Sequence, residues 1–154
     1  MITIEIDDAQ VRAVLDRLAK RAANPRAALL EIGEELREST LKRFTTSAAP
    51  DGSRWAPNSL VTRLRKKGDK PLIGAGKALS TQIHYRVADD AVYIGSPMVY
   101  AATQQFGARK GAFGTSRRGG PLPWGDIPAR PFLGLSADDR KTIEAIIRDY
   151  LSGG

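Results

Sequence analysis

The stretch that decides the fold comprises residues 83–95 and reads IHYRVADDAVYIG. Apolar and polar residues alternate through its first half, which is typical of a β-strand with one buried face. The Ala-Asp-Asp-Ala sequence in its middle is typical of a turn, and Val92 and Ile94 resume the alternation after it. The stretch therefore predicts an antiparallel hairpin, which we expect to span residues 79–95.

Upstream of the hairpin, helical periodicity replaces this alternation, and two helices are expected within residues 8–45. The carboxylate of Asp7 or Asp8 can accept hydrogen bonds from the first free amides of the first helix. The second helix is expected to start at Pro25, because proline suits the first helical position, and to run to about Phe44. Both helices carry apolar side chains on one stripe, which we expect to pack on the sheet.

Downstream, a C-terminal helix is expected at residues 137–151, where apolar residues recur on one face. Ser136 and Asp139 lie at its start and resemble a capping box, in which each side chain bonds the backbone amide of the other residue. Two shorter helices are expected near residues 60–65 and at residues 97–107, the second of which is stopped by a glycine.

Two further strands are expected, one at the N-terminus and one just before the C-terminal helix. Residues 2–6 alternate apolar and polar side chains. Residues 127–135 contain Pro128 and Pro131, and each proline fixes its own φ and extends the residue before it. The order of these elements predicts an α+β fold, in which helices pack on a small, mostly antiparallel sheet.

The length and composition bound the class of protein. A chain of 154 residues is expected to form a single domain, here residues 1–154. The absence of cysteine excludes disulfides, thiolate catalysis and cysteine-ligated zinc. No apolar run approaches the ~20 residues that span a bilayer, and the N-terminal MITIEIDD does not resemble a signal peptide. We therefore expect no membrane contact and a protein that is made and used on the cytoplasmic side.

The net charge of +7 lies mainly in two loops. We expect an irregular basic loop at residues 46–78 and a mobile, glycine-rich basic loop at residues 108–120. Three interpretations of these two loops remain: a solvated loop, an ordered protein interface, or contact with nucleic acid. The candidate contact residues are Arg65, Lys66 and Lys67 in the first loop and Arg109, Lys110, Arg117 and Arg118 in the second.

The sequence contains no complete motif for catalysis or cofactor binding. The GAGKALS sequence at residues 74–80 resembles a phosphate-binding loop, but Pro71 and Ala78 stand where that motif needs glycine and serine or threonine. His84 is the only histidine and falls on the polar face of the expected hairpin, without an identifiable nucleophile or orienting partner. We therefore expect no catalytic residues, no cofactor and no metal.

Four motifs occur in a familiar order: PDGSRWAPNS, KPLIGAGKALSTQI, DDAVYIGSPMVYAATQQFGA and IPARPFLGLSADD. Together they resemble the phage virion morphogenesis family of Mu-like phages and prophages, which is akin to phage tail-completion proteins. The resemblance covers about residues 44–147. Ala75 departs from it, because threonine is expected at this position, and the basic loop after Gly107 varies in such proteins.

The resemblance implies a structural virion protein that acts at the neck, where the tail is completed and joined to the DNA-filled head. Related folds form rings, often of six subunits. The implied partners are further copies of the chain, other neck, connector and tail proteins, and DNA that passes through the channel. The alternative, which rests on charge alone, is a basic nucleic-acid-binding protein.

Four residues of these motifs are candidate subunit contacts. Trp55 is either an interface anchor or a cap on the edge of the core. Tyr100, Gln105 and Phe106 lie in the third motif and are further interface candidates.

The fourth motif adds Arg130 as a candidate contact. The flanking prolines restrict its backbone, so its side chain can be held toward one partner. We expect that partner to be a carboxylate, within the subunit or between subunits, because a buried charge is costly without one. Phe132 and Leu133 are expected in the core.

Overall fold

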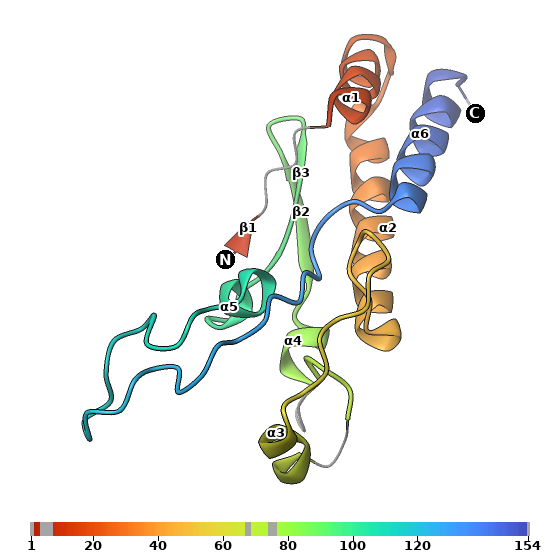
Figure 1. The fold of residues 1–154 in the computed structure, drawn as a ribbon. Helices are drawn as coiled ribbons and strands as arrows, with labels where there is room; N and C mark the ends of the chain where they lie inside the picture. The colour runs from red at the N-terminus through yellow and green to blue at the C-terminus, as the bar shows by residue number, and fades with distance from the viewer. Residues whose placement is uncertain (1, 4–7, 67–68, 74–76, 154) are drawn as a thin grey trace.

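The protein is described by a computed structural model that covers residues 2–3, 8–66, 69–73 and 77–153. It has the expected α+β fold, with helices beside a three-stranded antiparallel sheet of order β1-β3-β2 (Figure 1). In chain order the elements are β1 (Ile2–Thr3), α1 (Ala9–Arg21), α2 (Pro25–Thr46), α3 (Leu60–Arg65), α4 (Ala78–Thr81), β2 (His84–Ala88), β3 (Ala91–Ser96), α5 (Ala101–Phe106) and α6 (Ala137–Leu151).

The hairpin forms as the alternation predicted. β2 pairs with β3 in antiparallel register, with Tyr85 opposite Ile94. Asp89 and Asp90 form the tight turn with φ values of 52° and 57°, the left-handed conformations of a type I′ turn. The hairpin starts later than expected, because residues 78–81 form the short helix α4.

The N-terminal elements form where they were expected, and only their bounds differ. β1 pairs with Gly95 and Ser96 of β3, and residues 4–6 of the expected strand lie outside the described residues. The side chain of Asp8 accepts hydrogen bonds from two amides of α1, which confirms its expected cap. α2 begins at Pro25 behind an Asn24 cap, as expected, and extends to Thr46.

Helix α2 is the centre of the fold. It packs against β2 and β3 on one side and against α6 on another, and α6 also packs against α1. A Cβ atom on Gly33 of α2 would lie 2.2 Å from Cδ2 of Tyr85 in β2, so glycine permits this close approach of helix and strand. No helix in the described part of the chain is long and apolar enough to cross a membrane.

The described chain buries two apolar clusters. The first lies between α1, α2 and α6 and consists of Val11, Leu18, Ala28, Leu29, Ile32, Ile143, Ile146 and Ile147. The second lies around the C-terminal end of α2 and consists of Phe44, Ala49, Trp55, Leu79, Ile83, Ala101, Phe132 and Leu133. Because several members of the second cluster come from irregular segments, side-chain hydrogen bonds become important there.

Candidate assembly surface

The proline-containing segment, residues 127–135, is extended but does not join the sheet, so the expected strand is wrong. In the described residues its one bridge joins Ile127 to Ala108. The physical reason lies in Pro128 and Pro131, which have no amide hydrogen and cannot form a regular ladder. Backbone groups of Pro131, Phe132 and Leu133 bond side chains instead.

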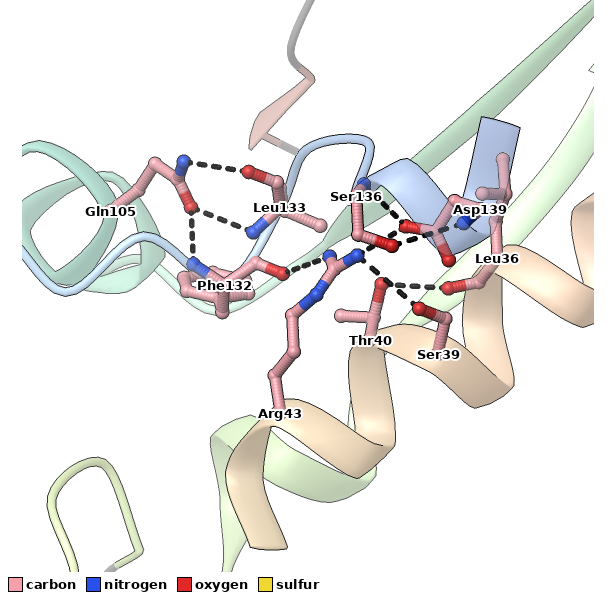
Figure 2. A network of polar contacts seen from close by, with 9 residues as sticks. All are labelled: Leu36, Ser39, Thr40, Arg43, Gln105, Phe132, Leu133, Ser136 and Asp139. Carbon is pink, nitrogen blue, oxygen red and sulfur yellow. Dashed lines mark hydrogen bonds and ion pairs between the residues drawn. The ribbon is translucent and has the colours of Figure 1, made fainter. Parts of the chain in front are cut away.

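The side chain of Gln105 takes the place of a neighbouring strand (Figure 2). Its Oε1 accepts hydrogen bonds from the amides of Phe132 and Leu133, each at 3.0 Å. Its Nε2 donates to the carbonyl oxygen of Leu133 at 3.1 Å. Gln105 is buried, so it acts inside the subunit and not at the subunit contact that we expected.

A buried ion pair holds the same segment from the other side. Nη1 of Arg43 in α2 donates to the carbonyl oxygen of Phe132 at 2.8 Å, and its Nη2 lies 2.5 Å from Oδ2 of Asp139 in α6. The two side chains are each 7% exposed. Burial lowers the pKa of Arg43, and the carboxylate of Asp139 opposes that shift. The pair therefore joins α2, the segment and α6 (Figure 2).

Asp139 also completes the expected capping box. Its Oδ2 accepts from the amide of Ser136 at 2.8 Å, and its own amide donates to Oγ of Ser136 at 3.0 Å. The sequence predicted this box but not the arginine. The available signal was the position of Arg43, seven residues after Leu36 on the apolar stripe of α2, where a buried side chain is expected.

Trp55 lies in the core, which is the second of its two expected positions. It is 6% exposed, and its ring meets Phe44 edge to face with centroids 5.5 Å apart. Its Nε1 donates to the carbonyl oxygen of Pro131 at 2.7 Å. Trp55 therefore anchors the loop after α2 to the proline-containing segment, and Phe132 and Leu133 are buried beside it as expected.

Arg130 is also buried, but its partners are not the expected carboxylate. Its Nε donates to the carbonyl oxygen of Ala56 at 2.7 Å, and its Nη2 donates to that of Pro57 at 2.8 Å. Its backbone amide donates to the carbonyl oxygen of Gln104 at 2.8 Å. No carboxylate of the described chain forms an ion pair with it. Two neutral carbonyls thus replace the ion pair that the sequence suggested.

The second basic loop is part of a projecting, hydrogen-bonded arm, residues 108–126, where a mobile loop was expected at residues 108–120 (Figure 1). Backbone bonds cross it along its length, including Phe113 to Leu122 at 2.7 Å and Ser116 to Gly120 at 2.7 Å. At its base Gly107 has φ +74°, and a Cβ there would lie 2.6 Å from the carbonyl oxygen of Ile127. Glycine therefore allows the two sides of the arm to meet.

Exposed hydrophobic side chains gather around α3, α5 and the arm. Figure 1 places these three elements toward one end of the molecule, opposite α1 and the C-terminal end of α6, and we call them the assembly end. Apart from Leu30, the large exposed hydrophobics of the described residues are Leu60, Val61, Leu64, Val99, Tyr100, Phe106, Phe113 and Trp124. Tyr100 and Phe106 are thus the two interface candidates that remain accessible.

The assembly end also carries the positive charge of both basic loops. Lys66 lies at the end of α3 and is half-buried, whereas Lys67 lies outside the described residues. The other basic candidates, Arg65, Arg109, Lys110, Arg117 and Arg118, are exposed. This end therefore combines apolar and cationic groups.

Catalytic geometry is not apparent in the part of the chain that the structure describes. No group of three or more histidine, cysteine, aspartate and glutamate side chains is placed there to hold a metal ion. His84 is exposed, as its strand position predicted, and its Nε2 lies 3.1 Å from Oε1 of Gln82.

Comparison with known proteins adds three relatives. The phage virion morphogenesis family matches residues 6–152 of the chain. Tail completion protein S of Escherichia phage P2 is 31% identical over 79% of this chain and 80% of its own length. Mu-like prophage FluMu G protein 2 of Haemophilus influenzae is 29% identical over 97% of this chain and 96% of its own length. Putative capsid assembly protein G of Escherichia phage Mu is 29% identical over 98% and 94%. No solved structure matches the chain significantly.

Proposed function

We propose that this chain, which belongs to the phage virion morphogenesis family, is a structural protein that completes the phage tail and joins it to the DNA-filled head. The family match extends over residues 6–152, and a relative that is 31% identical is named a tail completion protein. In this proposal the protein is an assembly component of the virion neck and not an enzyme.

The observation that carries the proposal is the assembly end. Eight large hydrophobic side chains on or beside α3, α5 and the arm remain exposed in the isolated subunit. Large apolar side chains that a soluble subunit leaves exposed favour burial against a partner. Trp124 and Phe113, which are 78% and 59% exposed, are suited to insertion into a neighbouring surface because they extend on the arm.

The partner that we propose first is another copy of the same chain. The arm projects from one side of the subunit, and its counterpart on the next copy is then a different surface. Such head-to-tail contacts generate a closed ring when the rotation between neighbours closes. We propose a ring around the DNA path at the neck, in contact with connector and tail proteins.

The cationic side chains of the arm suit this position, because they can lie close to DNA in the channel. The rival function, a dedicated nucleic-acid-binding protein, makes a different prediction for a titration with labelled duplex DNA. Weak binding that falls steeply with salt fits a basic arm beside a DNA channel. Tight, sequence-specific binding that survives moderate salt would favour the rival.

Deletion of the gene from its phage or prophage tests the proposed function. Electron microscopy of induced lysates is expected to show filled heads and separate tails that fail to join, and a plasmid copy of the wild-type chain restores joined particles. Normal infectious particles from the null mutant would overturn the proposal.

A further inference from the structure

A cleft of about 720 Å³ opens at the assembly end between α3, α4, α5 and the proline-containing segment. Among the described residues, the cationic side chains of Lys66, Lys77 and Arg130 line it, and Asp126 is the one acidic residue of that lining. Its apolar walls include Leu79 and Ile127. The cleft is therefore a concave site in which positive charge is concentrated.

Arg130 lies at the inner side of this cleft and is 7% exposed. Its Nε and Nη2 donate to carbonyl oxygens, which leaves Nη1 without a hydrogen bond to the described residues. Every fully buried side-chain nitrogen or oxygen among those residues has a partner, so Nη1 is not fully buried. Two hydrogen bonds thus hold the guanidinium, and its third nitrogen keeps some exposed surface at a residue that lines the cleft.

Lys66 brings a second positive charge to the same place. Its Nζ donates to the carbonyl oxygen of Lys70 at 2.9 Å, a neutral partner. Burial lowers the pKa of Lys66, and the charge of Arg130 lowers it further. Burial likewise lowers the pKa of Arg130. Two cations held together with neutral acceptors favour the entry of an anion.

We propose that this cleft binds a carboxylate side chain on a peptide segment of a partner subunit in the assembled virion. The inference rests on the proposed function and adds the chemistry of the contact. A guanidinium with one free edge can donate to a carboxylate, and Lys66 and Lys77 add charge around it. The apolar walls can contact the rest of the segment.

The burial of Arg130 favours a carboxylate over a DNA backbone. A side chain from a peptide can enter and reach a guanidinium that is 7% exposed, whereas a duplex presents its phosphates on a broad surface. The exposed arginines of the arm are better placed for DNA.

The test is a titration of the full, ¹⁵N-labelled chain with a capped hexaglutamate peptide, followed by NMR. We expect the Nε–Hε signal of Arg130 and the amide signals of Thr62 and Gln104 to shift most, because these residues line the cleft.

Lys66→Gln is expected to weaken peptide binding about tenfold. Lys20→Gln removes the same charge from exposed Lys20 in α1 and is expected to change the affinity less than twofold. Melting curves establish that both variants are folded.

Shifts spread over the arm and α1, or equal losses in both variants, would overturn the assignment of the cleft. Pyrophosphate and a duplex DNA are the competitors. If either displaces the peptide from the cleft and binds more tightly, the site takes phosphate and the carboxylate assignment is wrong. These measurements use the purified chain, so their failure is distinguishable from that of the proposed function, which depends on the assembly of particles.

Discussion

Gln105 pairs with Leu133 through two hydrogen bonds, one donated by the amide of Leu133 at 3.0 Å and one received by its carbonyl oxygen at 3.1 Å. A single side-chain amide thereby gives the main chain the donor and acceptor that a neighbouring strand would supply. This contact positions the proline-containing segment against α5, from which the arm begins.

Replacement of Gln105 by leucine is expected to lower the free energy of unfolding by about 2–4 kcal/mol. The loss arises because buried amides of Phe132 and Leu133 and the carbonyl of Leu133 lose their partner. Gln104→Leu on the same helix is the matched control and is expected to change stability by less than about 0.5 kcal/mol. Urea unfolding measures both, and equal losses would contradict the role of Gln105.

Arg43 and Asp139 are expected to show strong coupling. Arg43→Ala and Asp139→Ala should each cost about 3–5 kcal/mol, because each leaves the opposite charge buried without its partner. The double variant should cost clearly less than the sum of the two. A double-mutant cycle from urea unfolding checks this, and strictly additive losses would show that the ion pair contributes nothing specific.

Arg130→Ala is expected to reduce stability more than Arg117→Ala. Arg130 donates charged hydrogen bonds to the carbonyls of Ala56 and Pro57, and their removal is expected to cost about 2–3 kcal/mol. Arg117 is exposed on the arm, so its loss should change stability by less than about 0.5 kcal/mol. Melting temperature and complementation of the null phage are the measurements. A larger stability loss in Arg117→Ala would reverse this ranking.

Trp124→Ser is expected to abolish complementation without changing the melting temperature. The side chain is 78% exposed, so it contributes little to the fold of the isolated subunit but can anchor the arm in an assembly. Leu30→Gln is the control, since Leu30 is an exposed hydrophobic residue of α2 outside the assembly end. Plaque titre and electron microscopy of lysates measure the effect, and full activity of Trp124→Ser would remove the arm from the proposed contact.

Asp8 is expected to make stability sensitive to acid. Its hydrogen bond with Arg140, together with the amides of α1, lowers the pKa of its carboxyl group in the folded protein. A depressed folded-state pKa stabilises the fold above the unfolded value of ~3.9 and loses that effect as the pH falls through the folded value. Asp8→Asn, and separately Arg140→Gln, should therefore reduce the loss of unfolding free energy between pH 7 and pH 2. An unchanged pH dependence in both variants would rule out this linkage.

Local sequence determined most of the regular elements of this protein, although it predicted neither the short helix α4 nor the irregular course of residues 127–135. The alternation on both sides of Asp89 and Asp90 was sufficient to predict the hairpin, because strand periodicity and turn chemistry act over a few residues. The caps at Asp8 and Ser136 were predictable for the same reason, since each bonds amides within three residues. The motif order also indicated the family that the comparisons show.

Tertiary structure alone decided the partners of the buried polar side chains. The sequence restricts the backbone around Arg130 through its prolines, but Ala56 and Pro57 reach it across more than 70 residues. Gln105 carries no local signal that distinguishes a surface amide from one that bonds buried main chain 27 and 28 residues away. The physical reason is that a buried polar group without a hydrogen-bond partner is energetically costly. Which partner lies within reach is determined only by the packing of distant segments.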